Sequence, residues 1–283
     1  MNKVGFVTFA QNTTTVDYLR LAYLQAMNIK SVMPQFPYAV IVDSNTAKQI
    51  TDAQRQVFDY VIELSEDYNA QGSEWKLANE CQVYDYTPFE ETIKLESDLL
   101  FTRSIEHWLP AFRLRDMVIS SGCKDYTGKL SHDRFYRRLF DDNELPDVYN
   151  GLMYFKRSDT AEHFFNIAKK INNNWPSIRD SALRKCNEEY PSTDVLYAIT
   201  AQVVGREHCT LPSLEFINFI HMKPHIQNWH NVENWTKMIM HEHEGDMIRI
   251  NNLNQYDPVH YYDKQYATDD LIKYYQQRIL RRS

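Results

Sequence analysis

Short apolar segments alternate with amphipathic ones along the first hundred residues. Apolar runs of strand length cover residues 4–10, 38–43, 59–64 and 92–95. Thr13 to Thr15 offer N-caps for a helix that extends to about Met27, and Thr51 with Gln54 forms a capping-box pattern. Strands that alternate with helices in this way predict a parallel sheet covered by helices.

The same alternation continues more loosely to the end of the chain. Residues 75–86 predict a helix, residues 116–120, 152–156 and 215–220 predict strands, and helices are expected after Ser158 and Ser192. Residues 238–250 alternate around a polar turn, which indicates a β-hairpin, and Thr268 caps a final helix. We therefore expect a main α/β domain over residues 1–225 and an extension over residues 226–283 that packs on the same domain.

Composition narrows the class of protein. The chain is 43% hydrophobic and 24% charged, and it has no apolar run long enough to span a bilayer, so we expect a soluble protein that does not bind membranes. Its four cysteines form no C-x-x-C motif and no leader peptide is recognisable, which favours free thiols and a cytoplasmic protein. The formal net charge of -7 disfavours long-range attraction of nucleic acid.

Two acids follow the apolar segment of residues 92–95. Glu96 and Asp98 are separated by Ser97 and would lie at the carboxyl end of a strand, the sheet edge where ligands bind in open α/β folds. Carboxylate oxygens suit Mg²⁺ or Mn²⁺, ions that commonly bridge protein acids to substrate phosphates. Two solvated loop acids are the structural alternative for this spacing.

The segment around these acids, TPFEETIKLESDLL from Thr87 to Leu100, resembles the DxD region of GT-A glycosyltransferases, including the glycogenin-like enzymes. The resemblance implies a mixed, mostly parallel sheet flanked by helices, and a divalent metal held on the diphosphate of a nucleotide sugar. It implies that Asp98 and Glu96 contact the metal. Glu96 stands where the family has Asp, so a contact through water or with the ribose stays open for it.

A second match lies about 120 residues later. The segment FIHMKP from Phe219 to Pro224, with Trp229 beyond it, resembles the late His and Lys-Pro-Trp segment of glycogenin-like enzymes. The resemblance implies that His221 completes the metal site and that Lys223 contacts the diphosphate. His225 is a competing metal ligand, because the gap between the family's His and Lys is longer than the single residue here.

Two further segments resemble parts of the same family. Tyr149–Phe155 is similar to the strand that lines the acceptor side of the pocket, and this implies a role for Asn150 in catalysis. Pro191–Leu196 is similar to a helix start whose acid faces the donor sugar, and this implies a catalytic role for Asp194. A turn and a first-turn helix charge are the structural alternatives.

The amino-terminal part of the chain would bind the nucleotide. Phe9, Gln11 and Asn12 follow the first strand, where GT-A proteins hold the base and ribose, and the amides of Gln11 and Asn12 offer both donors and acceptors. Asp43 ends the second strand and is a candidate for the same pocket. Lys76 lies where related enzymes place a basic residue toward the donor phosphates.

These matches together predict a metal-dependent hexosyl- or pentosyltransferase that uses Mn²⁺ or Mg²⁺ and a nucleoside-diphosphate sugar, in particular a UDP-sugar. Residues 135–150 and the block around Glu96 look most like phage-encoded proteins, which implies action in a host cytoplasm on hydroxymethylated pyrimidine in double-stranded DNA. Glycosylation of a glycan or protein, and non-catalytic binding of a nucleotide sugar, are the alternatives. No general base stands out, so retention or inversion stays open, although the resemblance favours retention.

Overall fold

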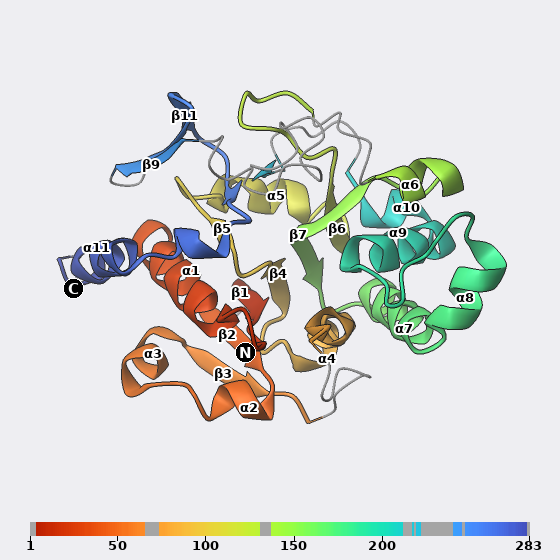
Figure 1. Ribbon diagram of the computed structural model, residues 1–283, viewed down its shortest axis with the longest axis horizontal. Helices are drawn as coiled ribbons and strands as arrows, with labels where there is room; N and C mark the ends of the chain where they lie inside the picture. The colour runs from red at the N-terminus through yellow and green to blue at the C-terminus, as the bar shows by residue number, and fades with distance from the viewer. Residues whose placement is uncertain are drawn as a thin grey trace.

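A six-stranded sheet runs through the centre of the molecule, and helices cover both of its faces (Figure 1). The computed structural model describes residues 4–65, 74–130, 137–211, 217, 219–221, 240–244 and 247–281. The strand order is β3-β2-β1-β4-β7-β6, and β7 runs antiparallel to both of its neighbours while the other strands are parallel. These strands are β1 (Val4–Phe9), β2 (Tyr38–Val42), β3 (Tyr60–Glu63), β4 (Glu91–Leu95), β6 (Met117–Ser121) and β7 (Val148–Lys156). The predicted mixed, mostly parallel sheet is confirmed.

Successive strand residues pack into two different cores, one on each face of the sheet. In β2, Val40 packs in the core that contains residues of α1, whereas Ile41 packs in the core that contains residues of α7 and α9. Because both faces are covered, these strands read as continuous apolar runs rather than as an alternation. The α-helices are α1 (Tyr18–Val32), α2 (Ser44–Ala47), α3 (Asp52–Val57), α4 (Val83–Tyr86), α5 (Leu109–Phe112), α6 (Arg138–Asn143), α7 (Asp159–Asn173), α8 (Trp175–Ala182), α9 (Thr193–Val204), α10 (Arg206–Cys209) and α11 (Asp269–Leu280).

The helix starts follow the capping residues in most cases. The capping box of Thr51 is present, and the side chains of Ser158, Ser192 and Thr268 accept hydrogen bonds from the first turns of α7, α9 and α11, as predicted. The first helix differs from the prediction: it begins at Tyr18 and ends at Val32, with Asp17 as its N-cap.

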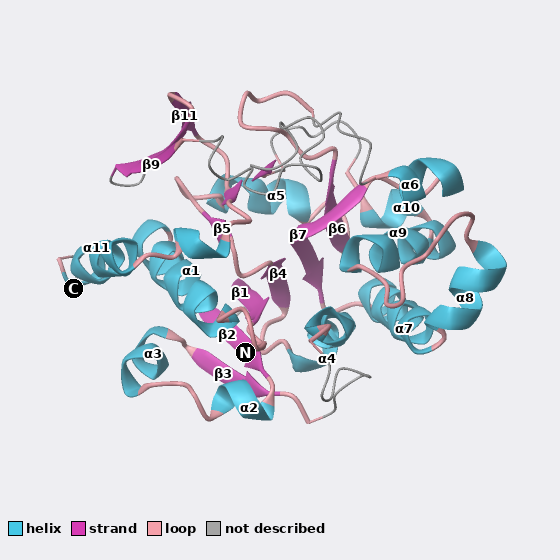
Figure 2. Cartoon of the chain, viewed as in Figure 1, coloured by secondary structure: helices cyan, strands magenta, loops and turns pink. Residues whose placement is uncertain are grey.

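A 3₁₀ helix replaces part of one expected α-helix. The helix predicted over residues 75–86 is a 3₁₀ segment, η1 (Lys76–Gln82), followed by the single turn of α4. Two further 3₁₀ segments are η2 (Glu106–Trp108) and η6 (Lys264–Tyr266). Figure 2 shows the longer helices on both sides of the central strands and the loops that join them.

Two small sheets join the carboxyl-terminal part of the chain to the rest. In the first, β12 (Val259–His260) lies between β5 (Leu99–Leu100) and β8 (Ile220–His221). In the second, β9 (His241–Glu244) and β10 (Met247–Ile250) form the predicted hairpin and β11 (Leu253–Gln255) adds a third strand. The last helix, α11, lies against α1, where the amide of Asn28 donates to the hydroxyl of Tyr275 (Figure 1). The domain boundary at residue 225 stays a prediction.

Two expectations from composition can be compared with the structure. All four cysteines are free, as predicted. Among the described residues, no helix combines the length and the apolar character that crossing a bilayer requires.

The first strand makes a close contact that excludes a side chain at Gly5. A Cβ atom at this position would lie 2.4 Å from Cζ of Phe89, whose ring is fully buried. We expect Gly5→Ala to lower the free energy of unfolding by about 1–3 kcal/mol, because the ring must move within a packed core. Urea denaturation measures this effect. Phe89→Leu makes room for the methyl group, so the double variant should lose less stability than the sum of the single variants; strict additivity would contradict the contact.

Candidate functional site

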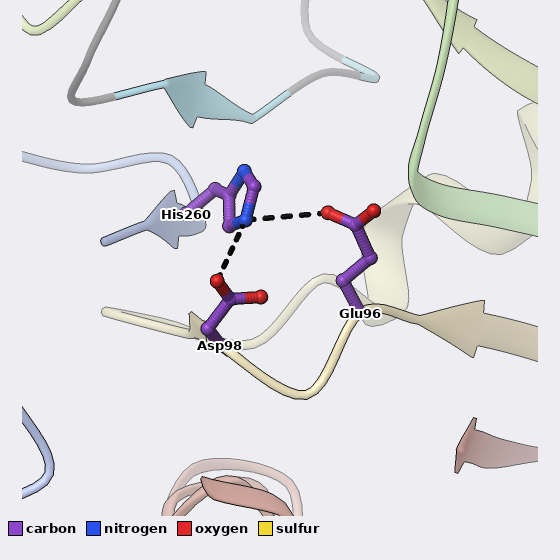
Figure 3. A group of neighbouring side chains, drawn as sticks. All are labelled: Glu96, Asp98 and His260. Atoms are coloured by element: carbon purple, nitrogen blue, oxygen red, sulfur yellow. Dashed lines mark ion pairs between the residues drawn. The ribbon is translucent and has the colours of Figure 1, made fainter. Parts of the chain in front are cut away.

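Two carboxylates and a histidine converge at the carboxyl end of β4 (Figure 3). Glu96 and Asp98 lie in the turn between β4 and β5, and His260 lies on β12. Nε2 of His260 is 3.0 Å from Oδ2 of Asp98 and 3.2 Å from Oε2 of Glu96. One ligand atom from each residue falls within 4.8 Å of the others. The acids therefore share a site instead of pointing separately into solvent.

Backbone hydrogen bonds hold this turn from several sides. The amide of Glu96 donates to the carbonyl of Gly151 on β7, and the amide of Tyr261, next to His260, donates to the carbonyl of Asp98, both at 3.1 Å. The side-chain amide of Gln25 on α1 donates to the carbonyls of Glu96 and Leu99. The two acids are thus presented by a backbone that three distant elements fix in place.

The ammonium of Lys264 balances the second negative charge of the site. Its Nζ forms an ion pair with Asp98 and lies 5.4 Å from the ring centroid of Tyr262. Lys264 belongs to η6, four residues after His260. Two basic and two acidic groups therefore meet here, which limits the cost of burying the carboxylates.

These neighbours shift the protonation equilibria of the site. Burial by itself would raise the pKa of the Asp98 carboxyl, but the charges of His260 and Lys264 outweigh it and hold that pKa far below its usual range. Burial, with Asp98 nearby, raises the pKa of Glu96. For His260, burial favours a lower pKa, but the two carboxylates outweigh it, so its pKa is raised. Without a cation, the site favours a protonated imidazole.

A cavity of about 500 Å³ opens in front of the cluster. Its walls include the two acids, His260 and Lys264, together with aromatic side chains. A second cavity of about 230 Å³ adjoins it and extends along the start of the chain toward Gln11. The two cavities share five wall residues, Phe9, Tyr18, Trp75, Leu77 and Glu80. They form one elongated depression with the cluster at one end and aromatic side chains in the middle.

The predicted nucleotide-binding residues divide into two groups. Phe9, Gln11 and Lys76 line the smaller cavity. Asn12 and Asp43 are absent from the described walls of both cavities, because each supports a helix: Oδ1 of Asn12 accepts from the amide of Leu19, and Asp43 caps α2. Asp43 also lies 3.7 Å from Nζ of Lys76, so it affects the cavity through that lysine.

Asn150 and Asp194 lie beside the cluster rather than in the described cavity walls. Nδ2 of Asn150 donates to Oε1 of Glu96 at 3.2 Å, and the backbone amide of Asn150 donates to Oδ1 of Asp194 at 2.6 Å. The other oxygen of Asp194 accepts from Arg137 at 2.9 Å. Asp194 therefore orients the strand that carries Asn150.

The third member of the cluster is His260 and not the predicted His221. β8 and β12 pair in parallel so that the two histidines are register partners, with ring centroids 4.8 Å apart. Because β12 lies between β8 and β5, His260 takes the place next to the acids and His221 lies one strand further away. Lys223 and His225 lie outside the described residues. Within the described part of the chain, Lys264, from the extension, is the lysine that reaches the acids.

Sequence reasoning missed His260 and Lys264, although a signal for them was present. His260 follows Pro258 and Val259 and precedes Lys264 by four residues, a longer spacing than the two residues from His221 to Lys223. Two carboxylates and an imidazole form a donor set that fits Mn²⁺ well and Mg²⁺ less well. The residues present thus fit a divalent cation of the kind that the sequence predicted.

Comparison with known proteins identifies the fold. No protein-family model matches the sequence, and no curated protein matches it. Among solved structures, an active-site mutant of the galactosyltransferase LgtC matches over 96% of this chain and 94% of its own, with 12% identity and a TM-score of 0.53. The apo structure of the bifunctional glycosyltransferase WbbM matches 98% of this chain with 50% of its own, at 11% identity and a TM-score of 0.53. The chain has the GT-A fold.

The raised pKa of His260 predicts how cation binding depends on pH. A cation can use Nε2 of His260 only after its proton has left, so binding Mn²⁺ must release that proton. We expect the apparent affinity for Mn²⁺ to increase by about tenfold per pH unit below the pKa of His260 and to level off above it. Titration of Mn²⁺ by electron paramagnetic resonance from about pH 6 to about pH 8.5 measures this. His260→Gln should bind more weakly and lose most of the pH dependence; an unchanged profile in that variant would contradict the assignment.

Proposed function

We propose that this protein is a metal-dependent glycosyltransferase that uses a nucleoside-diphosphate sugar. The observation that supports it most directly is the Glu96–Asp98–His260 cluster at one end of the elongated depression, on the sheet edge where open α/β folds bind ligands. The GT-A fold, shared with structures of glycosyltransferases, supports the same conclusion. A bound Mn²⁺ or Mg²⁺ would supply positive charge that offsets the negative charge of the departing nucleoside diphosphate.

The two cavities suit the two halves of such a donor. The smaller one offers the aromatic faces of Phe9, Tyr18 and Trp75 for stacking of a base such as uracil, and Lys76 at its wall offers a positive charge. The larger one, next to the acids, would hold the sugar and the acceptor group. Holding both reactants in one depression converts a bimolecular step into an effectively unimolecular one.

Lys264 would contribute the second positive charge of the site. It now pairs with Asp98. With Asp98 holding a cation, the ammonium of Lys264 would pair with a donor phosphate while remaining at the cavity wall. Asp194, both of whose oxygens accept hydrogen bonds, would orient Asn150 rather than take a proton from the acceptor.

Removal of the Asp98 carboxylate tests the proposed activity. We expect Asp98→Asn to lower hydrolysis or transfer of the donor sugar by about 100-fold or more, because the cation loses a charged ligand. The donor is found first by thermal-shift screening of nucleotide sugars with Mn²⁺, and turnover is then measured by release of the nucleoside diphosphate. Asp180→Asn, an exposed acid paired only with its neighbour Arg179 among the described contacts, is the control and should remain active.

The same assay separates this proposal from its alternative. A protein that binds a nucleotide sugar but releases no nucleoside diphosphate, with or without Mn²⁺, would be a non-catalytic binding protein. Equal turnover of Asp98→Asn and the unmodified chain would refute the metal-dependent mechanism.

Hydroxymethylated pyrimidine in DNA is the proposed acceptor, and it rests on the sequence resemblance alone. We expect label from the donor sugar to reach a duplex that contains hydroxymethylcytosine and not a matched duplex that contains cytosine. The transfer should fall as salt rises, because an acidic protein with a net charge of -7 must bind DNA through a local basic surface. If a glycan or peptide is labelled while both duplexes stay unlabelled, the acceptor is that glycan or peptide and not DNA.

A further inference from the structure

A lysine is fully buried in the central sheet directly behind the cluster. Lys94 is a residue of β4, two positions before Glu96, and its side chain has no exposed surface. Its neighbours Ile93 and Leu95 pack in the core that contains α1 residues, so Lys94 points to the opposite face of the sheet. Lysine is among the residues least often buried completely, and its burial here costs free energy unless its charge is well paired.

Two groups receive the hydrogen bonds of this ammonium. Nζ of Lys94 forms an ion pair with the carboxylate of Glu80 on η1, and it donates to Oδ1 of Asn150 on β7 at 2.7 Å. Three elements therefore meet at one buried charge. A buried ion pair adds little to stability compared with apolar packing. The role of this pair therefore lies in the side chains that it orients.

The ammonium and the neighbouring carboxylates favour the same orientation of the Asn150 amide. A lysine ammonium only donates, so it requires the oxygen of the amide to face it. Nδ2 then faces three acceptors, Oε2 of Glu80 at 2.7 Å, Oγ1 of Thr193 at 3.1 Å and Oε1 of Glu96 at 3.2 Å. A rotated amide would place its oxygen against both carboxylates, which is repulsive.

Glu96 is thereby held at both of its oxygens. Oε1 accepts from Asn150, and Oε2 lies 3.2 Å from Nε2 of His260. We propose that Lys94 is a positioning residue for the cation site: through the amide of Asn150 it keeps Glu96 turned toward Asp98 and His260. This inference rests on the proposed function, because it assigns Glu96 as a ligand of the cation.

The test compares Mn²⁺ affinity in three variants by electron paramagnetic resonance, with thermal melting as the check on folding. Lys94→Met removes the ammonium but leaves Glu80 buried without its charged partner, so Glu80→Gln is combined with it in a second variant that removes both charges. Ile93→Ala is the matched control, since it truncates an equally buried residue of β4 on the other face of the sheet. The unmodified chain is titrated alongside.

We expect Mn²⁺ to bind about 10- to 100-fold more weakly to the folded Lys94→Met/Glu80→Gln variant, the range typical of residues that orient metal ligands. Lys94→Met should show the same loss if it folds. Ile93→Ala should melt at a lower temperature yet bind Mn²⁺ within about twofold of the unmodified chain.

Unchanged affinity in the folded double variant would overturn the role of Lys94 and leave the cation site standing. An equal loss in Ile93→Ala would also overturn it, since the effect would then follow from weakening the strand. If the unmodified chain binds no Mn²⁺, the proposed function fails at its metal site, and the positioning role falls with it.

Discussion

The structure depends on neutralising two acids that a turn holds in a largely buried position. Asp98 is buried and Glu96 is partly buried, with 25% of its side chain exposed, and carboxylates removed from water are costly unless positive or hydrogen-bonding groups compensate them. The compensation comes from His260 and Lys264, more than 160 residues further along the chain. Pairing of β12 with β5 brings them there, so a two-residue strand joins the carboxyl-terminal part of the chain to the chemistry of the main sheet.

The polar groups extend from the cavity wall into the interior of the sheet. Asn150 connects Glu96 and Glu80, which both line the cavity, to Lys94 behind them. Each member donates to or accepts from the next, so the orientation of one side chain constrains the others. Such a network favours a single arrangement of the acids before any ligand arrives, which is the condition for effective electrostatic stabilisation of a reaction.

The likeness to LgtC and WbbM establishes the fold of this protein and not its activity. These chains share the arrangement of strands and helices, but only 11–12% of their residues are identical. A fold supports many activities, so the function has to be argued from the site. In this protein, two carboxylates, a histidine and a lysine lie together beside an aromatic depression at one sheet edge.

Local features of the sequence were sufficient for most strands of the main sheet, for several helix starts and for the two acids of the site. Apolar runs predicted the strands, Ser158, Ser192 and Thr268 predicted helix starts, and Glu96 and Asp98 were identified because they directly follow a strand. The other half, His260 and Lys264, was decided by tertiary structure. β8 and β12 each carry a histidine in a strand of two residues, and no local pattern specifies which of them lies beside β5. The buried pairing of Lys94 was hidden for the same reason: its partners come from segments distant in sequence, and only the packed sheet brings them together.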